Sequence, residues 1–131
     1  MITSRTGFFR LGALALGSAL LVASAARAGE IVMALEEPTA GSAYSGVSNL
    51  RGWAVGSAGI DRVELYVDGT FETNVPVGGL RGDVGDRYPG FPDSRNSGFS
   101  MAFNYSNLSA GPHAVRVRAV DGQGASQEAT V

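Results

Sequence analysis

The stretch IDRVELYVDGTFETNVPV, residues 60–77, decides the fold. In its first half Val63, Leu65 and Val67 alternate with more polar side chains, which is the two-residue period of a strand with one buried face. Asp68-Gly69 follows immediately, and this dipeptide accepts the positive φ angles of a two-residue hairpin turn. The stretch therefore predicts a β-hairpin that packs one apolar face on a core.

The chain should return from this turn as an antiparallel strand over 71–77, which Pro76 ends or places at a sheet edge because proline has no backbone N–H. Short apolar patterns bounded by turn residues predict five more strands, over 31–36, 47–55, 99–105, 115–119 and 125–131. About seven strands and no helix indicate an all-β fold. We expect a single antiparallel β-sandwich of the immunoglobulin-like or fibronectin-III-like type.

Residues 1–28 have the pattern of a secretory signal peptide. Arg5 and Arg10 precede an apolar run over 11–22, and Ala26-Arg27-Ala28 resembles a cleavage site. Cleavage there leaves residues 29–131 as one domain, secreted or periplasmic and without a membrane anchor. The apolar run is short for a membrane span, so an uncleaved anchor is the less favoured alternative.

Composition excludes several classes of function. Without residues 1–28 the chain has seven Arg, no Lys and twelve Asp and Glu, hence a net charge of −5. Such a surface does not attract nucleic acid or anionic membrane, because both require clustered positive charge. The chain has no Cys, which excludes disulfides and thiol chemistry, and we predict no cofactor.

Residues 81–97, hereafter the 81–97 segment, read as a long loop rich in Gly, Pro, Asp and Arg without helix or strand periodicity. Loops of this length are uncommon inside compact domains and are often functional. Pro89-Gly90 fits the centre of a type II turn. Tyr88 and Phe91 are expected to anchor the segment on the sandwich, over Trp53.

The predicted partner-binding surface combines this segment with the outward face of the strand over 60–67, which bears Arg62, Glu64 and Tyr66. The residues expected to contact a partner are Tyr66, Arg87, Tyr88, Phe91 and Arg95. Pairing through the edge of the final strand is a second route, because an uncovered edge offers unpaired backbone groups.

A calcium site is a weaker hypothesis for the same segment, which carries the carboxylates Asp83, Asp86 and Asp93. Calcium takes oxygen ligands from loops. Three arginines of the segment, Arg81, Arg87 and Arg95, neutralise these carboxylates. The residue spacing of a calcium-binding loop is also missing. We therefore expect internal Arg–Asp pairs and no bound metal.

Catalysis is not expected. The sole histidine, His113, would need a serine such as Ser94 or Ser97 brought beside it, and no G-x-S-x-G pattern is present. A role in capping a turn or an edge suits His113 better. An aromatic platform for sugar rings, built from Trp53, Tyr66, Tyr88 and Phe91, is the alternative function that the sequence leaves open.

Several motifs carry a resemblance to a known family. They are Gly52-Trp53-Ala54, Gly59-Ile60, residues 63–69 (VELYVDG), Asp83-Val84, residues 88–93 (YPGFPD), residues 96–99 (NSGF), Gly111-Pro112-His113, residues 117–121 (VRAVD) and Gly124. This pattern resembles bacterial Ig-like modules, which in larger secreted or surface proteins act as spacers or binding units. The resemblance implies a non-catalytic module with an interaction or accessory role at the cell envelope, where its partner is an unidentified protein or glycan. A carbohydrate-binding module is the alternative, and a module detached from a longer protein stays open.

Overall fold

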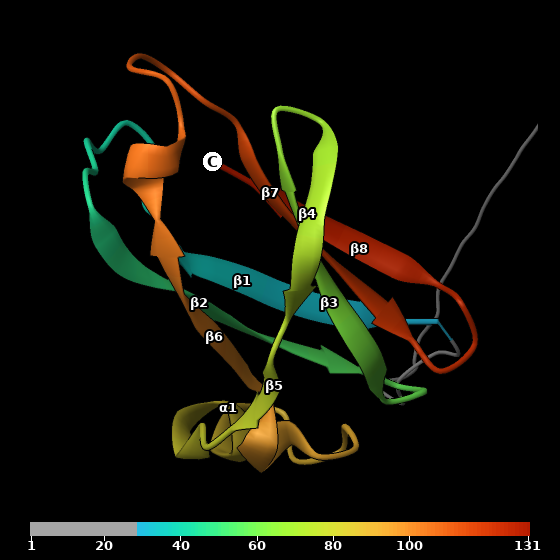
Figure 1. The fold of residues 1–131 in the computed structure, drawn as a ribbon. Coiled ribbons are helices and arrows are strands. Elements are labelled where there is room, and N and C mark those ends of the chain that lie inside the picture. The colour runs from blue at the N-terminus through green and yellow to red at the C-terminus, as the bar shows by residue number, and fades with distance from the viewer. Residues whose placement is uncertain (1–28) are drawn as a thin grey trace, which may run out of the picture.

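The computed structural model describes residues 29–131, and the predicted signal peptide lies outside the described residues. Two four-stranded antiparallel sheets face each other (Figure 1). The first has the order β1-β2-β6-β5, formed by β1 (Ile31–Glu37), β2 (Val47–Gly56), β6 (Gly98–Asn104) and β5 (Val77–Gly79). The second has the order β4-β3-β7-β8, formed by β4 (Thr70–Val75), β3 (Ile60–Val67), β7 (Val115–Asp121) and β8 (Ser126–Thr130). The predicted antiparallel sandwich is confirmed, and its strand order is that of an immunoglobulin-like domain.

The hairpin predicted at Asp68-Gly69 joins β3 to β4, and both turn residues have positive φ, 51° and 84°. As Pro76 indicated, the returning strand is an edge strand and ends at Val75. Only its predicted bound at 77 is wrong, because the chain changes sheets at Pro76. Before Pro76 it forms β4, an edge strand of the second sheet; after it, β5 pairs with β6 in the first sheet. Proline cannot donate a ladder hydrogen bond, so the crossing falls where the ladder would be broken anyway. The domain therefore has eight strands where the sequence indicated about seven.

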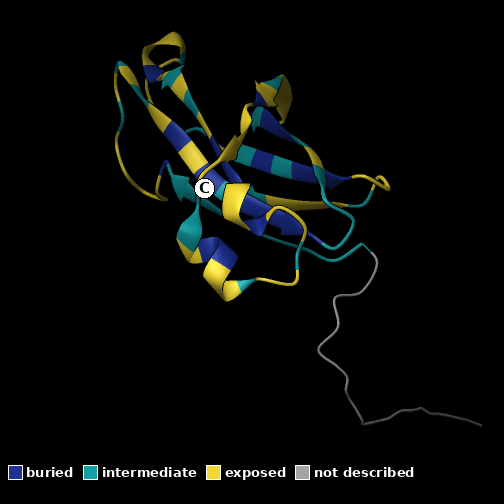
Figure 2. Cartoon of the chain, turned by 90° about the horizontal axis from the view of Figure 1, so that it is seen from below, coloured by how far each residue is buried: buried dark blue, intermediate teal, exposed yellow. Residues whose placement is uncertain are grey.

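The core lies between the two sheets, and buried positions alternate with more exposed ones over much of β2 and β7 (Figure 2). β3 and β7 pair across the centre of the second sheet, which places their apolar residues opposite β2 and β6. The residues with at most 1% exposure in this cluster are Leu50, Val63, Leu65, Phe99, Val117 and Ala119. The alternation read from the sequence of β6 is also confirmed, since Phe99 and Tyr105 are buried while Ser100, Ala102 and Asn104 are exposed.

The expectation of no helix is wrong in the 81–97 segment, which contains α1 (Gly82–Arg87) and a 3₁₀ turn, η1 (Ser94–Asn96). A second 3₁₀ turn, η2 (Tyr105–Asn107), follows β6. α1 is too short to show a helical period in the sequence, and it begins where the Arg81 carbonyl accepts from the Gly85 N–H at 3.0 Å. Across residues 29–131, no helix has the length and apolar character needed to cross a membrane.

The turn at Pro89-Gly90 also differs from the expectation. Gly90 does not have the positive φ that a type II turn requires. The Phe91 N–H donates to the Tyr88 carbonyl at 3.1 Å, which closes the turn with φ at Gly90 outside the left-handed region. Proline at the second position suits both type I and type II turns, so the Pro-Gly dipeptide alone does not distinguish these two types.

Candidate recognition surfaces

The residues predicted to bind a partner fall on two separate parts of the sandwich. Tyr66 lies on β3, close to the β3–β4 turn, whereas Arg87, Tyr88, Phe91 and Arg95 lie in the 81–97 segment. Figure 1 shows that α1 and this turn occupy opposite ends of the molecule. The two halves of the predicted surface must therefore be judged separately.

An aromatic and cationic cluster covers the outward-facing side of the second sheet, hereafter the outer face. The Tyr66 ring meets the Phe71 ring edge-on, with centroids 5.7 Å apart and planes at 73°. The Arg116 guanidinium lies over the Tyr66 ring, 4.2 Å from its centroid, within the range of a cation–π contact. Antiparallel pairing explains this meeting, because Tyr66 is opposite Phe71 on β4 and opposite Arg116 on β7. Residues 66, 71 and 116 are called the Tyr66 cluster below.

Glu64 joins this cluster to the charged residues at the other end of β3. Its carboxylate accepts from Arg62 Nε at 2.7 Å and from the Tyr66 hydroxyl at 2.9 Å. The Arg62 hydrogen bond, followed by that of Tyr66, outweighs burial and holds the pKa of Glu64 below its usual range. Although Glu64 points outward as expected, it is 9% exposed because its neighbours cover it.

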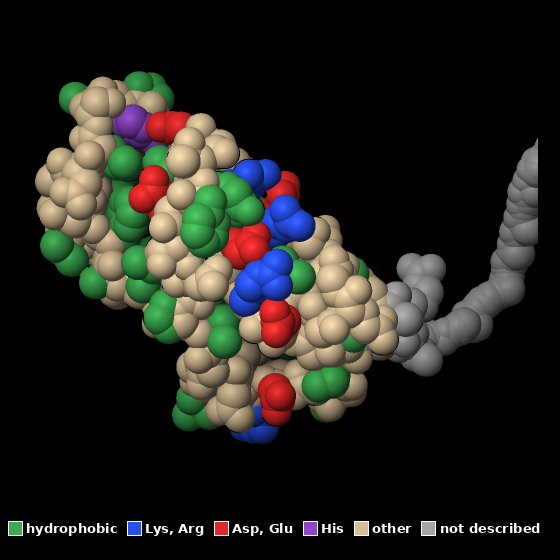
Figure 3. Space-filling model, turned by 45° about the vertical axis from the view of Figure 1, so that its right-hand side comes forward, with side chains coloured by type: hydrophobic (Ala, Val, Ile, Leu, Met, Phe, Trp, Pro, Cys, Tyr) green, Lys and Arg blue, Asp and Glu red, His purple; other side chains and the backbone are tan. Residues whose placement is uncertain are grey.

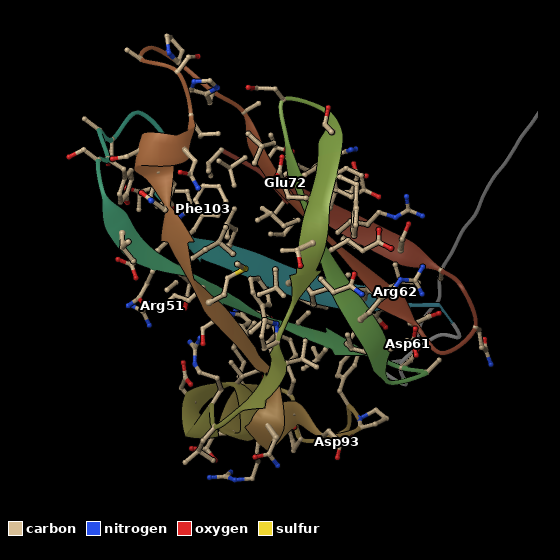
Figure 4. The ribbon with its side chains drawn as sticks, viewed as in Figure 1. Arg51, Asp61, Arg62, Glu72, Asp93 and Phe103 are labelled. Carbon is tan, nitrogen blue, oxygen red and sulfur yellow. The ribbon has the colours of Figure 1, made fainter. Side chains whose placement is uncertain are left out.

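Arg62 also donates to Asp61 at 3.0 Å, and the two side chains lie together at the start of β3 (Figure 4). Opposite charges alternate with apolar side chains across this side of the molecule (Figure 3). Farther along the same face Arg116 pairs with Glu128 at 2.9 Å. The outer face is therefore aromatic at Tyr66 and Phe71 and carries charges of both signs around these two rings.

The 81–97 segment is held to the sandwich by Arg81. Its guanidinium donates to both carboxylate oxygens of Glu36 on β1, at 2.8 and 3.0 Å, and to those of Asp83, at 3.0 and 2.9 Å. These partners raise the pKa of Arg81, and the Arg81 hydrogen bonds lower the pKa of Asp83 to about 2. The start of the segment is thus attached to β1 by charge-assisted hydrogen bonds, which are stronger than hydrogen bonds between neutral groups.

The aromatic anchor predicted for this segment is confirmed. Tyr88 packs on Trp53, with ring centroids 5.5 Å apart and planes at 37°, and Phe91 meets Tyr88 edge-on at 5.8 Å. All three rings are half-buried, and part of the surface of each ring is covered by its contact with a neighbouring ring. The rings are mutually tilted rather than coplanar. They form an anchor, and Tyr66, the fourth residue of the sugar platform considered from the sequence, lies apart from them on β3.

Of the three carboxylates considered for calcium, two are paired with arginines and the third lies apart from those two. Asp83 pairs with Arg81, and Asp86 accepts from Arg95 at 2.8 Å, which confirms the expected Arg–Asp pairing for these two. Asp93 lies elsewhere in the segment (Figure 4), at a positive φ of 54° before η1. Within residues 29–131, no group of three or more metal-ligating side chains could hold an ion.

His113 has a role that sequence reasoning assigned only in outline. Its Nδ1 faces Asp68 Oδ2 at 2.6 Å and its Nε2 faces the Ser109 carbonyl at 2.6 Å, so both ring nitrogens meet acceptors. Asp68 also accepts from the Ala114 N–H at 2.8 Å. The Asp68 hydrogen bond, then that of Ser109, raises the pKa of His113, and His113 lowers that of Asp68. Because both ring nitrogens already face acceptors, neither is open to a substrate.

This arrangement, hereafter the His113 clamp, joins the β3–β4 turn to the loop before β7, and Figure 3 shows the histidine beside an acidic side chain at one end of the molecule. The predicted turn-capping role is therefore confirmed. The partner, Asp68, was recognised only as a turn former. The 45 residues that separate it from His113 left no local signal of their contact.

Comparisons with known proteins give one family. No curated protein and no solved structure matches this chain at a significant level. The family model described as bacterial Ig domain matches residues 32–117, which is more than half of the chain and includes β1 from its second residue and β2 to β6 entirely. With its two facing sheets and their strand order, the chain belongs to the bacterial Ig domain family.

Proposed function

We propose that this bacterial Ig domain is a non-catalytic, secreted or periplasmic recognition module that binds another protein of the cell envelope through the outer face. The Tyr66 cluster is the single observation that carries the proposal. Tyrosine and arginine are enriched among residues that dominate binding energy at protein interfaces. Phe71 is 51% exposed beside them, so a large apolar side chain is open to a partner.

The cluster is also ordered before any partner arrives. Three contacts hold the Tyr66 ring: Phe71 at its edge, Arg116 over its face, and Glu64 at its hydroxyl. A side chain that is already immobilised loses little further entropy on binding, which favours affinity. The matching partner surface has an apolar centre and charges of both signs around it.

The 81–97 segment supports the proposal less well. Tyr88 and Phe91 pack on Trp53, and Arg95 is paired with Asp86. These contacts stabilise the segment itself. Its side chains take second place to the Tyr66 cluster as a binding surface.

Site-specific crosslinking tests the proposal. A photoreactive phenylalanine analogue is placed at Phe71 in one variant and at Val47, exposed on the first sheet, in a matched control; the two positions are 51% and 68% exposed. In native envelope preparations we expect one discrete protein adduct from position 71 and none from position 47. The partner in that adduct is then purified for affinity measurement.

Tyr66→Ala and Arg116→Ala should each weaken binding of that partner by roughly tenfold or more, as expected for central interface residues. Val47→Ala should leave the affinity unchanged. Equal adducts from both positions, or affinity unaffected by Tyr66→Ala in a folded variant, would contradict the proposal.

A further inference from the structure

The loops over 38–45 and 105–113 lie at the end of the sandwich opposite α1 (Figure 1), and a cleft of about 770 Å³ lies between them. The β3–β4 turn is at the same end, and His113 in the cleft lining contacts Asp68 of that turn. One wall is the loop over 38–45, between β1 and β2, and the other is the loop over 105–113, between β6 and β7. This volume lies within the roughly 300–1,000 Å³ usual for small-molecule sites. The cleft, hereafter the end cleft, is formed only when the fold brings these loops together.

The lining of the end cleft is rich in hydroxyl groups and nearly without charge. Its serine and threonine members are Thr39, Ser42, Ser45, Ser106 and Ser109. Arg, Asp and Glu are absent from the described lining, and His113 already engages Asp68 and the Ser109 carbonyl. A charged ligand would find there only His113, which Asp68 already pairs with, and a purely apolar ligand would leave the hydroxyls without partners.

Tyr44 and Tyr105 supply an aromatic side to the end cleft. Their rings stack with centroids 4.9 Å apart and planes at 26°, and Tyr44 is half-exposed. Tyr105 is 8% exposed, and its hydroxyl has no hydrogen-bond partner within the described part of the chain. Buried hydroxyls nearly always have a partner, so an orphaned one on the wall of a cleft indicates a missing group. Burial raises the pKa of Tyr105 to about 12, so the orphan is a neutral hydroxyl.

We propose that the end cleft binds a neutral saccharide. The sugar hydroxyls exchange hydrogen bonds with Ser106, with the paired Thr39 and Ser42 hydroxyls, and with Tyr105. Ser106 Oγ accepts from the Gly46 N–H at 2.7 Å, which leaves its own proton to donate, and the Thr39–Ser42 pair at 2.6 Å leaves one hydroxyl proton free. The apolar face of the sugar ring lies on Tyr44, whose other side is supported by Tyr105.

This site is separate from the platform of Trp53, Tyr88 and Phe91 considered from the sequence, and from the outer face of the proposed function. Its failure and the failure of the protein-binding proposal are therefore distinguishable. Saccharide binding in the end cleft can fail while crosslinking at Phe71 succeeds, and crosslinking can fail while the saccharide binds.

The test is a titration of the ¹⁵N-labelled protein with maltotriose, cellotriose and tri-N-acetylchitotriose at millimolar concentrations, followed by amide chemical shifts. We expect saturable shifts for at least one trisaccharide, confined to residues 38–46 and 105–113. Phe71→Ala, which removes an exposed aromatic ring outside the end cleft, should bind as the unaltered protein does. Tyr44→Ala should weaken binding by roughly tenfold or more.

Tyr105→Phe separates a binding role from a structural one. Removing a hydroxyl that has no partner should raise the melting temperature of the free protein, whereas removing a ligand partner should lower saccharide affinity. Both changes together support the proposal. No shifts with any of the three sugars, shifts centred on Trp53 and Tyr88, or unchanged affinity in Tyr105→Phe would each overturn it.

Discussion

Gly52 on β2 offers the sharpest test of how the two sheets pack, because a single methyl group there would meet two obstacles. A Cβ built at this position overlaps the Ala34 carbonyl oxygen of β1 and lies 2.6 Å from Cζ of Phe99. The first obstacle is backbone, held in the β1–β2 ladder, and the second is a core ring that is 1% exposed. Neither can move without disturbing its own packing.

The expected loss for Gly52→Ala follows from two opposing contributions. Alanine is intrinsically better than glycine in a strand by about 0.5–1 kcal/mol. Overpacking a well-packed core costs about 1–3 kcal/mol, and the upper part of that range applies when backbone blocks the new atom. The net expectation is a loss of about 1–2 kcal/mol in the free energy of unfolding. For a domain of this size that lowers the melting temperature by about 4–16 °C.

Gly90→Ala is the matched control, because nothing lies within 4 Å of its added Cβ and its φ is not left-handed. It should leave the melting temperature unchanged or raise it slightly, through the lower entropy of the unfolded chain. Both variants are compared by thermal unfolding followed with circular dichroism at neutral pH. A melting temperature of Gly52→Ala equal to or above that of the unaltered protein would refute the argument from close packing.

Three further predictions concern other parts of the fold. The pKa of His113 is raised in the folded state, so the stability that its interaction with Asp68 gives the fold is fully present below the ordinary histidine pKa of 6.5. That stability is lost as pH rises through the pKa of His113 in the folded protein. The pKa of Asp68 is lowered, so its contribution to stability is lost as pH falls through a value below 3.8. The difference in melting temperature between the protein and His113→Gln should therefore shrink on going from about pH 5.5 to pH 9, and a constant difference would argue against the charged clamp. Leu50→Ala removes a fully buried core side chain and should lower the free energy of unfolding by about 2–5 kcal/mol, measured by urea denaturation; a loss below this range would mean that the core collapses around the gap. Tyr88→Ala removes the anchor on Trp53 and should speed proteolysis within residues 81–97, while costing less global stability than Leu50→Ala; unchanged cleavage would show that Arg81 alone holds the segment.

The limits of sequence reasoning are clearest at Pro76. Alternation and the Asp68-Gly69 turn predict the hairpin correctly, because both signals are local. The same rules mark Pro76 as the end or the edge of the returning strand, but they do not show that the chain leaves one sheet and joins the other there. Proline marks a break in the ladder in either case, and only the position of β6 decides which sheet receives the next residues.

The recognition surfaces show the same division. Tyr66 was expected on an outward face from alternation, and the arginine over its ring comes from β7, 50 residues later. The anchor of Tyr88 and Phe91 on Trp53 was predicted correctly. Helix α1 was missed, since six residues with two glycines show no periodicity.

By itself the sequence determined the all-β class, the strand faces, the Asp68-Gly69 hairpin and the pairing of arginine with aspartate in the 81–97 segment, because each depends on residues close in the chain or on composition. Tertiary structure alone decided the Tyr66 cluster, the His113 clamp and the end cleft. Each of these joins side chains or loops far apart in sequence, and their meeting depends on strand register and sheet order, which no local pattern specifies.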